Sequence, residues 1–209
     1  MSSVSRLMQG RTKQQVVSEF RSAEILNAAR KVFSKRGFND VTVDEIAAAA
    51  GLAKATVYQY FPSKQEIYLA ALRHGIRELV DRTRRNIDTA QGVREKIEAF
   101  VRTRLAYLEE HREFFAVYHA EFGNLTHPAI LNREFRGLYQ QQLELLESLI
   151  RAGVKSGEVS RVAPPVLATM IYEASRGLML RRALGWTEST VEQEVTALMN
   201  MIWKGIGNR

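Results

Sequence analysis

The segment from Val41 to Lys64, VTVDEIAAAAGLAKATVYQYFPSK, constrains the fold of this chain more than any other stretch. Thr42 is followed three residues later by Glu45, the spacing of a capping box in which each side chain binds the other residue's backbone N–H. A helix is therefore predicted to start at Val43. Because glycine readily adopts the left-handed conformation that ends helices, Gly51 is expected to stop it.

A second short helix is predicted directly after this turn. Val57 and Phe61 lie four residues apart and would face inward together, and Pro62 would end the helix. Ser63 and Glu66 then repeat the capping-box spacing and open a third helix. Two short helices joined by a glycine turn and followed by a capped third helix form the pattern of a helix-turn-helix DNA-binding unit.

Lys64 lies in the first turn of the third predicted helix, where a cation is unfavourable because the helix N-terminus carries partial positive charge. A DNA phosphate bound there would explain the lysine, and the alternative is a solvated surface lysine. Side chains of the second helix, chiefly Lys54, Gln59 and Tyr60, are expected to approach base edges. The full set predicted to contact DNA is Thr42, Lys54, Ala55, Thr56, Tyr58, Gln59, Tyr60 and Lys64.

The positive charge of the chain is concentrated around this unit. Residues 1–65 carry ten Lys and Arg against five Asp and Glu, a balance of +5, and the remaining residues carry twenty against eighteen, a balance of +2. Such a field favours phosphate binding and fast, salt-sensitive association without selecting a base sequence. Double-stranded DNA is therefore the expected macromolecular partner.

The residues of this motif resemble the N-terminal signature of the tetracycline-repressor (TetR) family of regulators. The resemblance covers roughly residues 22 to 72 and departs from the family at Ala53, where such proteins usually carry a serine that caps the second helix. Loss of a cap typically costs ~1 kcal/mol, so this helix is expected to be looser without DNA. The matching residues are Ile25, Ala28, Ala29, Phe33, Gly37, Phe38, Thr42, Val43, Ile46, Ala47, Ala50, Gly51, Thr56, Val57, Tyr58, Tyr60, Phe61, Ser63 and Lys64.

Helical signals continue through the rest of the chain, so the predicted fold class is all-α. A three-helix helix-turn-helix DNA-binding domain would be joined by a long helix to a C-terminal helical ligand-binding and dimerisation domain. We expect a flexible basic arm at 1–20, the DNA-binding domain at 21–66 and the C-terminal domain at 67–209. Further helices are predicted at Val93–Glu109, Arg112–Phe122, Pro128–Gly153, Pro164–Leu184 and Thr190–Ile206.

The composition excludes several classes of protein and site. The 209 residues, 45% of them hydrophobic, are enough for one or two ordered domains. The absence of cysteine excludes disulfides, thiolate metal sites and cysteine nucleophiles. No apolar run approaches the ~18–20 residues of a membrane span and the N-terminus lacks a signal-peptide core, so a cytoplasmic protein is expected.

No catalytic or metal-binding pattern stands out. His111, His119 and His127 recur every eight residues, but eight helical residues advance the side chain by ~12 Å, too far for a shared metal ion. The chain has no glycine-rich phosphate loop, no Gly-x-Ser-x-Gly elbow and no HExxH motif. We therefore expect neither an enzyme nor a metal or cofactor site.

Aromatic side chains gather between residues 100 and 139, at spacings that suit either a plain helical core or a ligand pocket. The resemblance favours a pocket, since TetR-type regulators usually bind an inducer between the helices of this domain. Glu173 and Arg176 could form an intrahelical pair, or face inward near Tyr172 and orient a ligand. The predicted ligand-binding residues are Phe100, Arg104, Tyr107, Phe115, Tyr118, His119, Phe122, Tyr139, Tyr172 and Arg176.

The last two predicted helices are apolar on more than one face, which suits either completion of the monomer core or a two-fold interface. In the resembling family this pair forms a four-helix dimer interface. A homodimer would present two recognition helices ~34–36 Å apart to a palindromic operator. The predicted interface residues are Val166, Met170, Ala174, Gly177, Leu178, Arg181, Val195, Leu198, Met199 and Ile202.

Taken with the resemblance, the sequence predicts a DNA-binding transcriptional repressor that a small, largely apolar or aromatic inducer releases from its operator. The alternative is a ligand-independent architectural or division-linked DNA-binding protein of the same fold. A cavity lined by the aromatic cluster would favour the regulator, and a filled core would favour the architectural protein.

Overall fold

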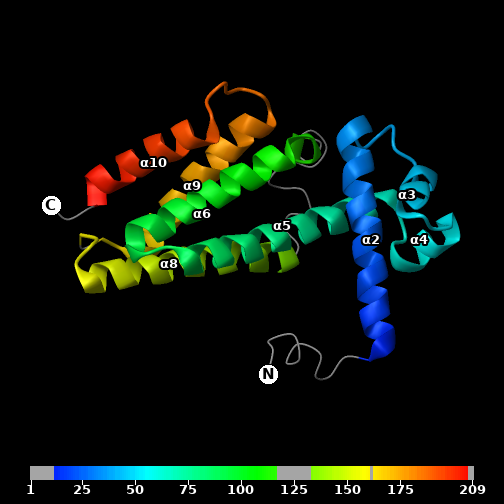
Figure 1. Cartoon of the computed structure of the whole chain (residues 1–209), viewed down its shortest axis with the longest axis horizontal. Coiled ribbons are helices and arrows are strands. Elements are labelled where there is room, and N and C mark those ends of the chain that lie inside the picture. The colour runs from blue at the N-terminus through cyan, green and yellow to red at the C-terminus, as the bar shows by residue number, and fades with distance from the viewer. Residues whose placement is uncertain (1–11, 117–132, 161, 207–209) are drawn as a thin grey trace. The chain divides into compact units, whose positions relative to one another are not determined.

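The computed structural model describes residues 12–116, 133–160 and 162–206, and every regular element within these ranges is a helix (Figure 1). The all-α prediction is confirmed. Residues 112–116 are helical, and the remainder of the predicted Arg112–Phe122 helix lies outside the described residues. The helices are α2 (Lys13–Arg36), α3 (Val43–Ala50), α4 (Lys54–Tyr60), α5 (Lys64–Thr89), α6 (Gly92–Glu110), α8 (Arg133–Ser156), α9 (Pro164–Ala183) and α10 (Val191–Ile206).

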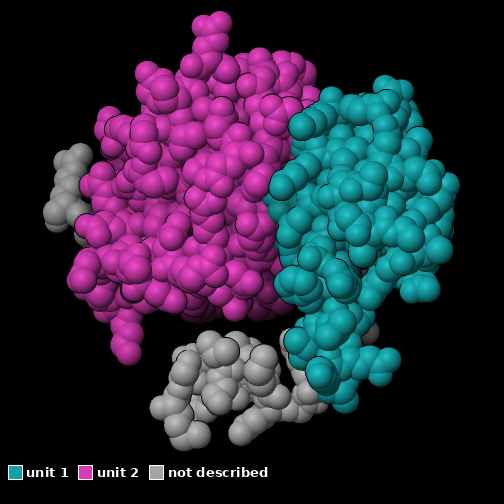
Figure 2. Space-filling model, turned by 45° about the vertical axis from the view of Figure 1, so that its right-hand side comes forward, with its two compact units in different colours: residues 1–74 teal, residues 75–209 magenta. Residues whose placement is uncertain are grey.

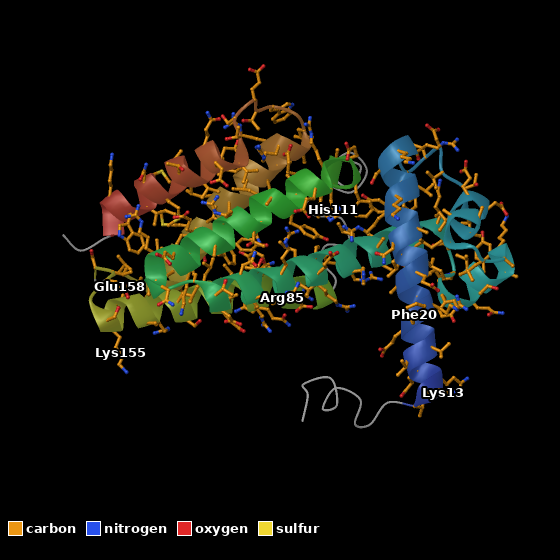
Figure 3. The ribbon with its side chains drawn as sticks, in the orientation of Figure 1. Lys13, Phe20, Arg85, His111, Lys155 and Glu158 are labelled. Atoms are coloured by element: carbon orange, nitrogen blue, oxygen red, sulfur yellow. The ribbon has the colours of Figure 1, made fainter. Side chains whose placement is uncertain are left out.

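Helix α2 begins at Lys13, so the prediction of a flexible arm is wrong for residues 13–20; residues 1–11 lie outside the described ranges. Thr12 caps this helix, since its Oγ accepts the Gln15 N–H at 3.2 Å and Gln15 Oε1 accepts the Thr12 N–H at 2.8 Å. Phe20 is exposed, as are the other apolar side chains of these turns (Figure 3). The segment therefore lacks the buried apolar stripe by which the other helices were recognised.

The chain divides into two compact units, residues 1–74 and residues 75–209, called the head and the body below (Figure 2). This boundary lies inside α5 and beyond the predicted boundary at residue 66. The reason is that the first turns of α5 belong to the core of the head. The buried ring of Tyr68 meets Phe33 edge-on, with 5.0 Å between centroids, and Phe38 at 5.6 Å.

The core of the head is built from α2, α3, α4 and the start of α5. Helices α2 and α3 pack on each other, and so do α3 and α4. The small side chain of Ala47 is buried in α3, which allows a neighbouring helix to approach closely. The fully buried apolar residues of this unit include Ile25, Ala29, Phe33, Ile46, Val57 and Ile67.

The core of the body is centred on α6, which packs against α8, α9 and α10. Its buried apolar cluster extends from Ile87 at the end of α5 to Ile202 in α10. Helix α9 begins with Pro164 and Pro165, whose missing N–H groups cost nothing in a first helical turn. Among the described residues, no helix combines the length and apolar character that crossing a membrane requires.

Candidate DNA-binding and ligand-binding sites

Helix α3 has the two ends that its sequence predicts. Thr42 Oγ accepts the Glu45 N–H at 3.3 Å, and Glu45 Oε2 accepts the Thr42 N–H at 2.8 Å, which completes the capping box. Gly51 adopts the left-handed conformation, with φ 66° and ψ 32°, and its N–H returns to the last carbonyls of the helix. The hydrogen bond from the Thr42 N–H holds the pKa of Glu45 below its ordinary value. The predicted capping box and helix stop are confirmed.

Helix α4, the recognition helix of the motif, is anchored by the fully buried side chain of Val57. Its N-cap residue, Ala53, has extended backbone angles, φ −73° and ψ 146°, and no side-chain cap bond. The expected absence of a cap is therefore confirmed. Of the predicted DNA contacts in this helix, Thr56 and Tyr60 are half-buried, and the exposed ones are Lys54, Ala55, Tyr58 and Gln59.

Lys54 links the N-terminal turns of the two helices of the motif. Its Nζ lies 2.7 Å from Asp44 Oδ2 in α3, and this hydrogen bond raises the pKa of Lys54. Both side chains are about half exposed or more, so the pair contributes little to stability. A phosphate that took over the ammonium group would have to compete with this carboxylate.

Lys64 has a different environment from the one its predicted phosphate contact implies. Its Nζ donates to the carbonyl oxygens of Phe38 at 2.8 Å and Asn39 at 3.0 Å, and lies 4.7 Å from the centre of the Phe38 ring. An ammonium group has three donors, so these two bonds leave at most one for a phosphate. Lys64 therefore holds the turn between α2 and α3, a role that neither sequence alternative included.

Most of the predicted ligand-binding cluster that the structure describes is buried in the body. Phe100 and Tyr107 are fully buried in α6, and Tyr172 is buried in α9. The half-buried ring of Tyr139 in α8 meets Tyr172 edge-on at 4.9 Å. Phe115 is also buried, 6.3 Å from the Tyr107 ring. Three further predicted residues lie outside the described ranges: Tyr118, His119 and Phe122.

Arg104 is the charged member of this cluster, and it is only 2% exposed. Its Nε donates to Ser175 Oγ at 3.1 Å and its Nη1 donates to Gln142 Oε1 at 2.5 Å. The guanidinium carbon lies 4.1 Å from the centre of the Tyr172 ring and 5.3 Å from that of Phe100. Residues of α6, α8 and α9 therefore meet at this one cation.

Arg176 does not belong to the buried cluster, which corrects its predicted ligand role. The side chain is 50% exposed and its Nη2 lies 2.6 Å from Glu173 Oε2, three residues earlier on α9. This is the intrahelical pair that the sequence allowed. Glu173 also accepts a hydrogen bond from the Tyr139 hydroxyl at 3.4 Å.

The predicted dimer-interface residues separate into two groups. The α10 members are buried within the monomer, because they pack into the core of the body, and their place at a dimer interface stays a prediction; they are Val195, Leu198, Met199 and Ile202. The α9 members remain accessible. Met170 is 63% exposed, and the other exposed members are Val166, Gly177 and Arg181. Ala174 and Leu178 are half-buried.

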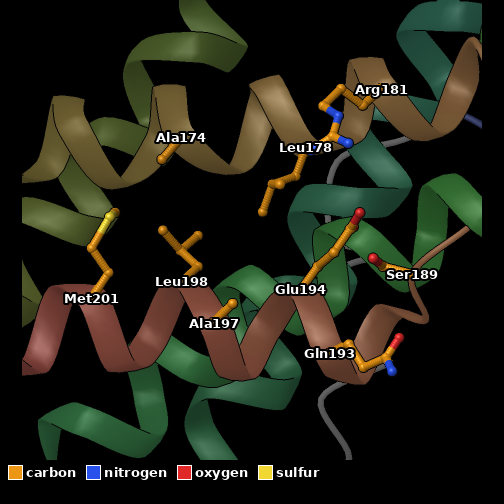
Figure 4. A pocket seen from close by; sticks show the side chains of 9 residues that line it. All are labelled: Ala174, Leu178, Arg181, Ser189, Gln193, Glu194, Ala197, Leu198 and Met201. Carbon is orange, nitrogen blue, oxygen red and sulfur yellow. The ribbon is translucent and has the colours of Figure 1, made fainter. Parts of the chain in front are cut away.

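An open groove of about 630 Å³ runs between α9 and α10. Figure 4 shows Ala174 and Leu178 of α9 directed toward the side chains of Leu198 and Met201 on α10. Met201 is 65% exposed. It and Ala197 are four residues apart on the outer face of α10, a spacing that could have singled them out as interface residues in the sequence. The remaining lining residues are Arg181, Ser189, Gln193 and Glu194.

The structure also locates one of the three regularly spaced histidines. His111 ends α6, and its ring lies 4.5 Å from that of Tyr107. His119 and His127 lie outside the described ranges. Within those ranges, no three His, Asp or Glu side chains come together as metal ligands.

Comparison with known proteins identifies the family of this chain. The model of bacterial regulatory proteins of the tetR family matches residues 25–71, and that of the tetracyclin repressor-like C-terminal domain matches residues 90–179. The HTH-type transcriptional repressor KstR2 of Rhodococcus jostii (strain RHA1) is 32% identical over 143 residues, 66% of this chain and 67% of that protein. The fatty acid metabolism regulator protein of Bacillus subtilis (strain 168) is 24% identical over 182 residues, 86% of this chain and 90% of that protein.

A solved structure gives the same answer for the fold. It is that of a transcriptional regulator from Saccharomonospora viridis in complex with choline, 28% identical with a TM-score of 0.75, and the match covers 92% of this chain and all of that one (100%). The two family models together match more than half of the chain. The chain therefore belongs to the tetR family of bacterial regulatory proteins and is a DNA-binding transcriptional regulator.

Proposed function

We propose that this protein is a transcriptional repressor that binds a palindromic operator as a homodimer and is released by a small, largely apolar or aromatic ligand held in the body. The observation that carries the proposal is the pairing of an exposed recognition helix in the head with a buried aromatic cluster that surrounds a cation in the body. The KstR2 relative, which is named a repressor, supports the direction of regulation.

The head supports base recognition by α4. Val57 anchors this helix in the core while Tyr58 and Gln59 face outward, Tyr58 with 45% of its surface exposed. An amide side chain can bind adenine through two hydrogen bonds in the major groove, and a tyrosine hydroxyl can bind a phosphate. We therefore assign base contact to Gln59 and phosphate contact to Lys54 and Tyr58.

The body supports dimerisation through the outer faces of α9 and α10. Val166, Met170 and Met201 each expose more than half of their surface, whereas large apolar side chains are usually covered in a monomer. Gly177 and Ala197 add small residues that let a second helix pair approach. Most soluble homo-oligomers are two-fold dimers, and a two-fold partner would place the same helices against these faces.

Release from DNA requires a ligand that binds two states of the dimer unequally. A ligand with the same affinity for both states would shift nothing, however tightly it bound. We propose that the ligand favours a state in which the two recognition helices no longer match successive major-groove faces. The buried cluster is suited to this because its residues come from α6, α8 and α9, so a ligand there contacts three helices at once.

The proposal is tested with the purified protein and a labelled DNA fragment from upstream of its own gene. We expect sequence-preferring binding that weakens steeply between about 50 and 200 mM salt. Gln59→Ala should cost ~1–3 kcal/mol and relax the preference at one base position, whereas Lys54→Ala should weaken binding to all sequences alike. Lys155→Ala, an exposed lysine of the body, is the matched control and should have no effect. Equal binding to unrelated DNA would contradict the proposal.

A further inference from the structure

Two arginines of the body, Arg104 and Arg182, are buried in the described ranges, and they have different partners. Arg182 is 6% exposed and pairs with the carboxylates of Glu109 at 3.2 Å and Glu194 at 3.5 Å. Arg104 is more deeply buried, and among the described residues its hydrogen-bond partners are a hydroxyl and an amide, both neutral. Within the described part of the body, one buried guanidinium is therefore paired with carboxylates, and the other has hydrogen bonds to neutral groups.

A buried charge without a partner of opposite sign is costly. Hydrogen bonds to Ser175 and Gln142 satisfy Nε and Nη1, and neither of these two bonds uses Nη2. The faces of Tyr172 and Phe100 attract the cation but carry no net charge. Because burying a cation costs more than neutral partners return, this arrangement suits a site whose counter-charge arrives with a ligand.

We propose that the ligand of the body is an organic acid whose carboxylate binds Arg104 and whose apolar part contacts the surrounding rings. This deepens the proposed function and rests on it for the link to DNA release. Carboxylate is the preferred anion because guanidinium N–H groups match its two oxygens in a plane. Phe100, Tyr172 and Tyr139 supply apolar surface beside the cation, which suits an aliphatic or aromatic acid.

The charge also decides what this site rejects. A cation placed beside Arg104 would be repelled inside a medium of low dielectric constant, where charges interact strongly. Choline, which occupies the related regulator from Saccharomonospora viridis, is therefore not expected to bind beside this arginine. A neutral ester retains the apolar contacts of the acid but cannot neutralise the guanidinium. The site thus discriminates between ligands of similar shape by their charge.

The test is direct ligand binding to the full chain without DNA, by calorimetry and thermal shift. The probes are decanoate, hexadecanoate and 4-phenylbutyrate, each with its methyl ester, and choline. We expect at least one acid to bind and to raise the melting temperature, its ester to bind at least tenfold more weakly, and choline to give no shift. This comparison uses the wild-type protein and does not depend on any variant folding.

Variants then assign the effect to Arg104. Arg104→Met should lose at least tenfold in affinity for the acid and bind acid and ester alike, whereas Arg104→Lys, which keeps the charge, should retain part of the preference. Arg94→Met, an exposed arginine of the same helix, is the matched control and should bind like the wild type. A purely structural role for Arg104 would change the melting temperature without changing the preference for acid over ester.

Two results would overturn the proposal: no acid in the panel binds, or acid and ester bind the wild-type protein equally. Failure of the proposed function is a separate outcome, since it appears in the DNA-binding experiment. If an acid binds through Arg104 but does not release the operator, the anion site stands and the inducer part of the proposed function is wrong.

Discussion

Helices α3 in the head and α6 in the body both begin with backbone N–H groups that have no partner inside the helix. In α3, Thr42 and Glu45 satisfy two of these groups from within three residues of sequence. In α6, the N-cap residue Gln91 makes no side-chain cap bond, and the N–H of Val93 instead donates to Glu158, 65 residues later, at 3.0 Å. The start of α3 thus uses near neighbours in the sequence, whereas the start of α6 uses one near neighbour, since the Gln91 N–H donates to Glu95 Oε2 at 3.0 Å, and one distant residue.

The same contrast holds for the glycines of the two units. Gly51 is required by its own backbone angle, and a Cβ there would meet no other atom within 4 Å. Gly153 in α8 has no such angle, but a Cβ there would lie 2.6 Å from Val159 and 3.0 Å from Val93. Gly51 is therefore needed for the local backbone conformation, and Gly153 is needed for the close packing of segments that lie far apart in the chain. The experiments below test this difference.

The largest effect on assembly is expected from a substitution in the proposed dimer interface of the body. Met170→Glu places an unpaired carboxylate on the outer face of α9, and burying such a charge costs about 3–5 kcal/mol. Dimerisation should weaken at least ~100-fold, as measured by analytical ultracentrifugation, and operator binding should fall with it. The control is Gln141→Glu, an exposed position of α8. If the variant remains dimeric, the interface lies elsewhere.

Gly153→Ala tests the close packing inside the body. The added methyl group overlaps Val159, so the free energy of unfolding in urea should fall by ~1–3 kcal/mol. Gly137→Ala, on the exposed side of the same helix, has open space and should stabilise the protein by ~0.5–1 kcal/mol. An equal response of the two variants would show that Val159 and Val93 give way without cost.

Gly51→Ala is the corresponding test in the head. A left-handed conformation costs a residue with a Cβ ~1–2 kcal/mol, so the free energy of unfolding of the head should fall by that amount. Gly51→Asn should cost less, because asparagine tolerates this conformation better. The two variants can be compared by hydrogen exchange in α3. A loss that is the same for Ala and Asn would contradict the conformational explanation.

Ala53→Ser should stabilise α4 by ~1 kcal/mol, because the hydroxyl of an N-cap serine can accept a hydrogen bond from a backbone N–H of the first turn, which the alanine side chain cannot do. The measurement is hydrogen exchange of the α4 amides together with DNA affinity. Ala55 lies inside the same helix and not at its N-cap, so Ala55→Ser should give no gain in stability. If Ala53→Ser changes neither stability nor DNA affinity, the cap argument for this helix is wrong.

The smallest expected effect is on the stability of α3 and α6 at acidic pH. Hydrogen bonds from backbone N–H groups lower the pKa of Glu45 in the head and of Glu158 in the body. A pKa that is lower in the folded state than in the unfolded state means that the ionised carboxylate stabilises the fold. This stabilisation is fully present above the ordinary pKa of 4.5, and it is lost as the pH falls through the lower pKa of the folded state. Glu45→Gln should reduce the acid sensitivity of α3 and Glu158→Gln that of α6, measured by hydrogen exchange at several pH values. An unchanged pH profile in both variants would remove this explanation.

Local features were predictable because their partners lie within a few residues. Thr42, Gly51 and Ala53 have the roles that the sequence predicts. Ser63 Oγ accepts a hydrogen bond from the Glu66 N–H at 3.1 Å at the start of α5. The start of α2 was missed because its first turns have exposed apolar residues, although Thr12 and Gln15 form a capping box of the same kind.

The sequence by itself determined the helix-turn-helix motif, the all-α class and the family of this chain, because caps, glycine stops and apolar spacing act through neighbouring residues. Tertiary structure decided which apolar face of α10 packs into the core and that Lys64 binds the carbonyl oxygens of Phe38 and Asn39. It also placed Arg104 among aromatic rings, where its hydrogen-bond partners among the described residues are a hydroxyl and an amide. These outcomes depend on residues tens of positions apart, and only the packed chain brings their charges and surfaces together.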